Sequence, residues 1–258
     1  MMAPLLRRRC RGRWDRGRWE RRRWDRWRRD RWRWCRPVSL ALTTFLLATT
    51  ADLSGAQGLS TGQRAALDAG ERVIVTEDVA GSAWPRITVL QFVAGSPEES
   101  AAVFMDYARH ASFVPNVLVS RVSRVVDSAT QEVDYVLSVP IAPDEAYTVR
   151  NRVSSTVPAR AGEPHAYRVE WTLVRATSTR SAQGEARFEP YRGGTLFTYR
   201  NLVVPGGRIA GLGFIRRRAQ QDVEATALAI ATQVVRLRAS DRALLDRQLK
   251  ALRAAVSP

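Results

Sequence analysis

Between residues 118 and 203, apolar and polar residues alternate in six short segments. Alternation with a period of two is typical of half-buried strands, and β-branched and aromatic residues are frequent in all six. The segments are 118–126, 132–140, 146–157, 166–175, 184–190 and 195–203. Turn-forming residues separate them, so the pattern predicts an antiparallel meander. Residues 85–93 form a further predicted strand, and 72–76 are a candidate first strand or one half of a hairpin.

Helical signals flank these strands. Ser96-Pro97-Glu98-Glu99 offers an N-cap, a proline at the first helical position and acids in the first turn, so we expect a helix to about Arg109. A short turn on Phe113 ends at Pro115. A long helix is expected over 211–239, with apolar residues at helical spacing that include Val223, Ile230, Val234 and Val235. Ser240 can cap a last amphipathic helix with Leu244, Leu245, Leu249 and Leu252.

The order of elements predicts an α+β fold. A curved antiparallel sheet of about seven strands would close around the long C-terminal helix, because a sheet with one apolar face needs a cover. Alanines at 225, 227, 229 and 231 leave space beneath that helix, and large amphipathic aromatics share the inward strand faces. For the set of residues we therefore expect a pocket for an apolar ligand, although ordinary core packing is the better explanation of any single aromatic among them.

The candidate ligand-contacting residues combine inward aromatics, two amides and two helix positions. They are Tyr107, Phe113, Tyr135, Tyr147, Asn151, Tyr167, Trp171, Phe188, Phe197, Tyr199, Asn201, Ala227 and Ile230. The two asparagines could bind a ligand head group, or could bond to backbone at a strand bend. Arg150, Arg152, Arg168, Glu170 and Arg200 have the opposite parity, which predicts a solvated outer face with cross-strand ion pairs.

This order of elements resembles the START-related helix-grip superfamily, which includes polyketide cyclase/dehydrase and lipid-transport proteins. The resemblance covers about 71–239. It is carried by Ser96-Pro97-Glu98-Glu99, Tyr107, Phe113-Val114-Pro115-Asn116, Val139-Pro140, residues 167–171, residues 181–190 (SAQGEARFEP) and residues 194–205 (GTLFTYRNLVVP). It implies binding of a lipid, quinone, polyketide or hormone, and it supplies no catalytic set to transfer. Fold alone does not determine function.

Motifs for chemistry are absent from the sequence. There is no GxSxG, HExxH or glycine-rich phosphate loop. His110 and His165 are the only histidines, and the body has no cysteine, so we expect neither a metal site nor a cofactor and assign no catalytic residue. His165 is interpreted as surface. His110 is interpreted as a residue at the pocket mouth or as a charge partner of a helix C-terminus.

The net charge of +16 is concentrated in the first 36 residues. This Arg/Trp-rich, low-complexity head holds 16 arginines and 4 acids, a net charge of +12, which leaves 16 − 12 = +4 for the other 222 residues. The folded body therefore needs no nucleic-acid partner. The head has three interpretations: a segment that binds nucleic acid or anionic membrane, an overlong start of an export signal, or a translated repeat upstream of the true start.

An apolar run at 38–50 follows the head, and small residues at Ser54-Gly55-Ala56 precede Gln57. Residues 37–56 therefore predict a cleaved signal peptide and a periplasmic or secreted protein; a buried helix and an uncleaved anchor are the alternatives. Residues 57–70 are a lead-in, 71–239 the helix-grip domain and 240–258 the final amphipathic helix.

The function expected from these features is non-catalytic binding or carriage of a hydrophobic small molecule, with a membrane surface as a second expected partner. Two alternatives remain. One is a cyclase or aromatase in which His110 or a tyrosine acts on a polyketide-like substrate. The other is an envelope or nucleic-acid-associated protein that acts through the Arg/Trp head.

Overall fold

The computed structural model describes residues 58–139, 143–156, 165–206 and 213–257. The Arg/Trp-rich head, the apolar segment of 37–56 and the expected cleavage site before Gln57 lie outside the described residues.

Eight strands of the described chain form one antiparallel sheet in the order β1-β2-β8-β7-β6-β5-β4-β3. They are β1 (Val73–Glu77), β2 (Arg86–Val93), β3 (Val117–Val125), β4 (Thr130–Leu137), β5 (Glu145–Thr156), β6 (Ala166–Ala176), β7 (Ser181–Tyr191) and β8 (Gly194–Val204). The predicted meander is β3 to β8. The expected count of about seven was one too low, because β1 is a full hairpin partner of β2. The sheet also does not close, since no pairing between described residues joins β1 to β3.

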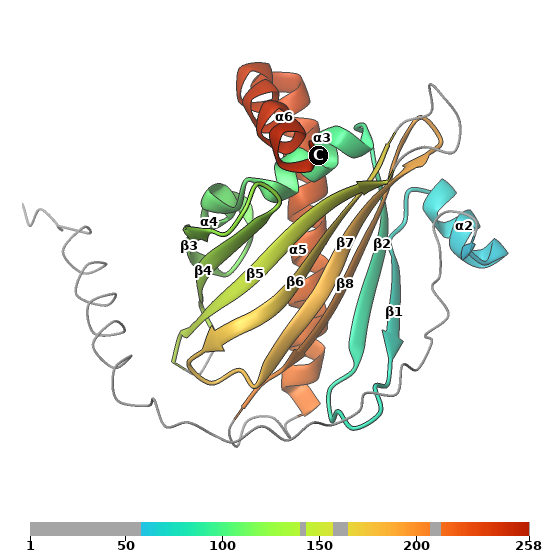
Figure 1. The fold of residues 1–258 in the computed structure, drawn as a ribbon. Coiled ribbons are helices and arrows are strands. Elements are labelled where there is room, and N and C mark those ends of the chain that lie inside the picture. The colour runs from blue at the N-terminus through green and yellow to red at the C-terminus, as the bar shows by residue number, and fades with distance from the viewer. Residues whose placement is uncertain (1–57, 140–142, 157–164, 207–212, 258) are drawn as a thin grey trace, which may run out of the picture. The chain divides into compact units, whose positions relative to one another are not determined.

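The sheet curves around the long helix α5 (Gly213–Ser240), which lies on its concave side (Figure 1). Helix α5 packs on β2 and β8, and helix α3 (Pro97–Met105) packs on β6, β7 and β8. Val89, Val169 and Phe188 from the sheet and Ala227 and Ile230 from α5 are at most 1% exposed. Burial of these apolar side chains is the main force that joins helix and sheet. The expected α+β arrangement is confirmed.

Helix α3 starts as the sequence predicts. The Ser96 hydroxyl accepts a hydrogen bond from the Glu99 N–H at 3.1 Å, and the Glu99 carboxylate accepts one from the Ser96 N–H at 2.9 Å, with Pro97 at the first helical position. The helix ends at Met105, earlier than the expected Arg109. A 3-10 turn, η3 (Tyr107–Arg109), and the short helix α4 (His110–Phe113) follow.

The C-terminal helix α6 (Arg242–Val256) buries its four leucines as predicted. Its N-cap is Asp241 and not Ser240, because Asp241 Oδ1 accepts from the Leu244 N–H at 3.1 Å while the Ser240 hydroxyl donates to the Arg236 carbonyl. Val235 of α5 was also misplaced: it is 47% exposed. It follows buried Val234 by one position, which turns it about 100° away around the helix.

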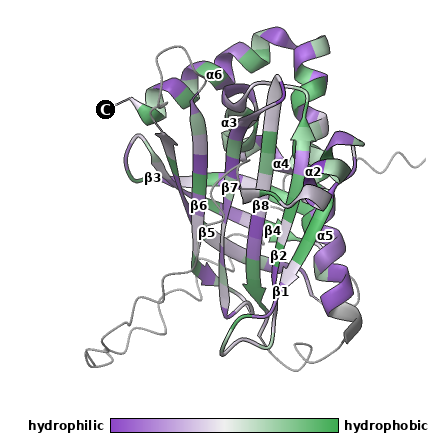
Figure 2. Cartoon of the chain, turned by 90° about the vertical axis from the view of Figure 1, so that its right-hand side faces the viewer, coloured by the Kyte–Doolittle hydropathy of each residue, from purple (hydrophilic) through white to green (hydrophobic). Residues whose placement is uncertain are grey.

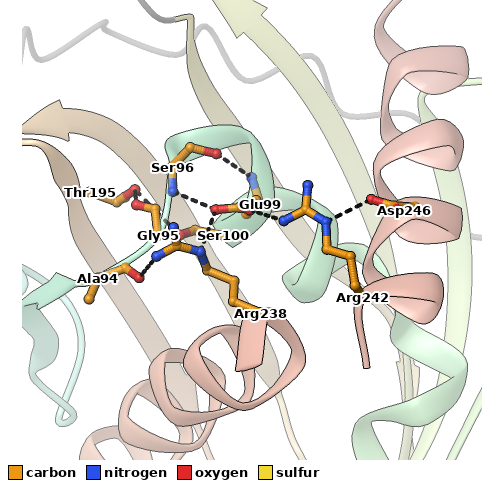
Figure 3. Close-up of polar contacts among 9 residues, drawn as sticks. All are labelled: Ala94, Gly95, Ser96, Glu99, Ser100, Thr195, Arg238, Arg242 and Asp246. Carbon is orange, nitrogen blue, oxygen red and sulfur yellow. Dashed lines mark hydrogen bonds and ion pairs between the residues drawn. The ribbon is translucent and has the colours of Figure 1, made fainter. Parts of the chain in front are cut away.

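Glu99 ties α5 and α6 to the start of α3 (Figure 3). Its carboxylate lies 3.2 Å from Arg238 Nε and 3.0 Å from Arg242 Nη1, while Arg238 also donates to the Ala94 carbonyl. The Arg253–Glu98 ion pair adds a second link between α6 and α3. Helix α6 is therefore docked on the body of the protein.

The lead-in contains helix α2 (Thr61–Asp68), which starts with a capping box at Ser60. Leu59 and Leu67 pack with Leu90 and Leu196, which face the convex side of the sheet. Among the described residues, no helix combines the length and apolar character that crossing a membrane requires.

Candidate functional site

The concave face of the sheet contains the two asparagines that were predicted to contact a ligand. Strand register places Asn151, Trp171, Gly184 and Asn201 in one row across β5, β6, β7 and β8. With strands about 4.8 Å apart, the Cα atoms of the asparagines are about 14 Å apart, and Trp171 lies between them. A Cβ at Gly184 would collide with the Trp171 ring and the Arg200 carbonyl. The glycine therefore makes room for the indole in this row.

The inward aromatics form a connected cluster whose centre is Phe104. This ring lies 5.7–6.4 Å from those of Tyr107, Trp171, Phe188, Phe197 and Tyr199. Trp171 stacks on Tyr199 at 5.3 Å, and Phe188 on Phe197 at 5.0 Å. Such pairs contribute about 0.5–1.5 kcal/mol each beyond their burial. These predicted ligand contacts therefore act largely as core.

Part of the concave face keeps some exposure. Tyr147, Tyr199 and Asn201 are half-buried although they point inward, whereas Phe188 and Phe197 are fully buried. Burial raises the pKa of the Tyr147 and Tyr199 hydroxyls, so both remain neutral donors. A ligand held here would meet neutral hydroxyls and aromatic faces.

The two asparagines are the polar groups that stand out on this face. Asn151 is 4% exposed and its Nδ2 has no hydrogen-bond partner, and Asn201 Oδ1 has none among the described residues either. A buried polar atom without a partner costs about 1–3 kcal/mol. Among the described residues, Asn151 Nδ2 and Asn201 Oδ1 bond to no backbone group, and the strand register shows no bend at either position. Both amides are thus available to a ligand head group.

His110 is buried in the aromatic cluster and lies at the C-terminal turn of α3, one of the two expected places, but as a neutral group and not as a charge partner. Its Nε2 donates to the Phe104 carbonyl at 2.8 Å, because a carbonyl only accepts, and the neutral Nδ1 then accepts from the Tyr135 hydroxyl at 3.0 Å. Burial lowers the pKa of His110 to about 4. The imidazole is therefore neutral near pH 7, and both its nitrogens are engaged.

The remaining predicted residues divide between core and edge. Tyr135 and Tyr167 are each 8% exposed, Phe113 is half-buried against the His110 ring at 5.6 Å, and Ala227 and Ile230 pack in the core. Ala227 and Ala231 are buried, but Ala225 and Ala229 are only half-buried. The alanine-rich surface that faces the sheet is therefore smaller than the sequence suggested.

The convex face matches the predicted solvated surface with cross-strand ion pairs. Arg150 pairs with Glu132 at 2.7 Å, and Arg168 and Arg200 both reach Glu185, at 2.7 and 2.9 Å. His165 is exposed, as expected.

Two inward polar residues were missed. Gln131 of β4 is the register partner of Asn151 on β5, and Gln91 of β2 is the register partner of Phe197 on β8. Gln91 could have been found, because it alternates with Val89 and Val93. Gln131 could not, since its place depends on the register of two strands. No cluster of three or more metal-ligating side chains occurs within the described residues.

No known family profile matches the chain, and no curated protein matches it significantly. Solved structures do match. A STAR-related lipid transfer protein from Xanthomonas axonopodis aligns over 63% of this chain and 93% of its own, with 17% identity and a TM-score of 0.53. Human STARD10 aligns over 72% and 78%, with 12% identity and a TM-score of 0.56. An aromatase/cyclase from a Streptomyces species aligns over 59% and 94%, with 16% identity and a TM-score of only 0.45.

At these identities the similarity concerns the fold. The chain has the same helix-grip fold as the STAR-related lipid transfer protein and human STARD10, which confirms the fold that the resemblance in the sequence implied.

Proposed function

We propose that the protein binds or carries a hydrophobic small molecule, such as a lipid, a quinone or a polyketide-like compound, and catalyses no reaction. The observation that carries this proposal is the row on the concave face in which Asn151 and Asn201, each with an unpartnered polar atom, flank Trp171. Apolar surroundings with a few polar groups are typical of small-molecule sites. The same fold in a protein named for lipid transfer supports it.

The geometry of His110 weakens the alternative of a cyclase-type enzyme. A general acid or base needs a proton-transferring atom within reach of substrate and a pKa near the working pH. Both nitrogens of His110 are already hydrogen-bonded, and its pKa lies near 4. The hydroxyl of Tyr135 donates to His110 and stays neutral, because burial raises its pKa. The hydrogen-bonded pair of Tyr135 and His110 is better suited to a structural role beside the site than to proton transfer.

The proposed site of action is outside the cytoplasm, after removal of residues 1–56. Intact-mass measurement of exported protein should show Gln57 or a near neighbour as the first residue, and a chain that retains Val38 would contradict this. Loss of function on deletion of residues 1–36 from correctly localised protein would favour the alternative in which the Arg/Trp head acts.

The test of ligand binding starts from native mass spectrometry of the purified protein, where a co-purifying apolar molecule is expected. The extracted molecule is then rebound to delipidated protein and to Asn151→Leu and Asn201→Leu variants. Each variant should bind about tenfold more weakly, as expected for a lost head-group hydrogen bond. Each should also be at least as stable as wild type without ligand, because an unpartnered buried amide is removed.

Ser154→Leu is the matched control, since Ser154 is an exposed residue of β5 on the opposite face. It should keep the wild-type affinity. Protein that carries no molecule and binds none of the three ligand classes would contradict the proposal, as would wild-type affinity in both asparagine variants.

A further inference from the structure

A groove of about 400 Å³ lies between α3, the turn that joins β3 to β4, and α6. Of the inward polar residues of the concave face, Gln131 also lines this groove, whereas the asparagines and aromatics of the concave-face site do not. Its walls come from Ala102 and Met105 of α3, Ser128 of the turn, and one side of α6. Its volume lies in the range typical of small-molecule sites.

The apolar part of the groove is built from small side chains. Ala102, Leu244 and Ala255 are buried in its walls, and Ala251 and Ala254 are exposed along α6. Figure 2 shows hydrophobic and hydrophilic positions alternating along α6. The alanines leave depth that longer side chains would fill, so a short hydrocarbon chain fits against this side of the helix.

The polar part of the groove contains one buried acceptor. Gln248 is 8% exposed, and its Nε2 donates to Asp106 Oδ2 at 2.6 Å. That bond fixes the carboxamide and leaves its Oε1 without a hydrogen-bond partner among the described residues. Buried carbonyl oxygens usually have a hydrogen-bond partner, and a ligand hydroxyl or N–H can fill that role here.

Two guanidinium groups add positive charge to the groove. Arg109 lies 3.5 Å from Asp106, and its side chain remains 47% exposed. Arg247 is exposed on α6 and has no ion pair with a described residue. Two cations face one anion here, so the groove favours an anionic group, for which arginine supplies a geometrically matched pair of donors.

We propose that this groove is a second binding site, which takes a small amphipathic carboxylate with a hydroxyl beside its head group. The carboxylate pairs with Arg247 and Arg109, the hydroxyl donates to Gln248 Oε1, and the hydrocarbon chain lies along Ala251 and Ala254. This site does not depend on the ligand proposed for the concave face, although Gln131 lies at the border of both.

The test titrates 3-hydroxydecanoate and decanoate into protein with labelled alanine methyl groups and follows each site by NMR. Shifts of Ala102, Ala251 and Ala254 report the groove, and shifts of Ala186 and Ala227 report the concave face. Both probes should saturate the groove signals, with the hydroxy acid binding several-fold tighter. Arg247→Gln and Arg109→Gln should each weaken binding about tenfold. Lys250→Gln, an exposed cation of α6 that does not line the groove, should have no effect.

Gln248→Met keeps the length of the side chain and removes the carboxamide, so it should abolish the preference for the hydroxy acid. Shifts confined to Ala186 and Ala227, or no saturable shift, would overturn the groove site and leave the concave-face proposal intact. Loss of binding at the concave face in the Asn151→Leu variant, with groove binding unchanged, supports two separate sites. Binding of vesicles that contain anionic lipid, lost in Arg247→Gln while the free probes cause no groove shift, would replace this proposal by membrane docking.

Discussion

At His110, burial and two hydrogen bonds select one tautomer of the imidazole. The Phe104 carbonyl requires a proton on Nε2, and the Tyr135 hydroxyl then donates to Nδ1. A second proton on the ring would lose the bond from Tyr135 and would place a charge among aromatic rings. The folded protein therefore resists protonation of this residue.

This resistance predicts a loss of stability in mild acid. The pKa of His110 is about 4 in the folded protein and about 6.5 in the unfolded chain, so between these values the unfolded chain binds more protons. The contribution of His110 to the free energy of unfolding is fully present above pH 6.5, and about 3 kcal/mol of it is lost as the pH drops to 4. In urea unfolding at pH 7.5 and 4.5, His110→Gln should show a smaller pH dependence than wild type. The exposed His165→Gln should keep the wild-type dependence, and an unchanged dependence in His110→Gln would contradict the assignment.

At the scale of single elements, α6 depends on Glu99, which is 7% exposed. Glu99→Gln removes the carboxylate that Arg238 and Arg242 share, although Arg242 keeps its ion pair with Asp246 and the amide can still cap α3 (Figure 3). The free energy of unfolding should fall by about 2 kcal/mol, less than for a fully buried pair because both arginines are about half exposed. Glu98→Gln is the control: its partner Arg253 is exposed, so urea unfolding should show a loss below about 1 kcal/mol. Equal losses in the two variants would mean that Glu99 has no special part in docking α6.

The sequence predicts the elements well, because their signals are local. Alternation locates every strand of the meander, and Ser96-Pro97 locates the start of α3. The sequence does not predict which residues of two distant strands become neighbours. Ile87 and Asn201, for example, are paired although they are more than 100 residues apart in the chain. The burial of His110 was missed for the same reason, since Phe104 and Tyr135 are brought to it by the turn after Met105 and by β4. The inward parity of Asn151 was predictable, and its lack of a partner was not.

At the scale of the whole described body, the two faces of the sheet differ in the kind of interaction they carry. The concave face is aromatic, whereas buried acids on the convex face each collect arginines from neighbouring strands. Asp134 is 2% exposed; it pairs with Arg121 and Arg175 and accepts from the Thr148 hydroxyl at 2.6 Å. These pairs connect β3, β4, β5 and β6 on the side away from α5. We therefore expect the ion pairs on the convex face to stabilise the curvature of the sheet that forms the concave site.

Glu185 provides the sharpest test of that support, because arginines from three strands converge on it. Arg168 of β6, Arg187 of β7 and Arg200 of β8 lie 2.7, 3.1 and 2.9 Å from its carboxylate, which is 6% exposed. Glu185→Gln removes the one charge that these cations share, so urea unfolding should show a loss of about 2–3 kcal/mol. Glu170→Gln changes an acid on the same face whose side chain is 51% exposed, and it should cost under about 1 kcal/mol. If the convex pairs hold the curvature of the sheet, Glu185→Gln should also weaken ligand binding on the concave face, which the variant does not touch. A destabilised protein with unchanged affinity would show that the two faces act independently.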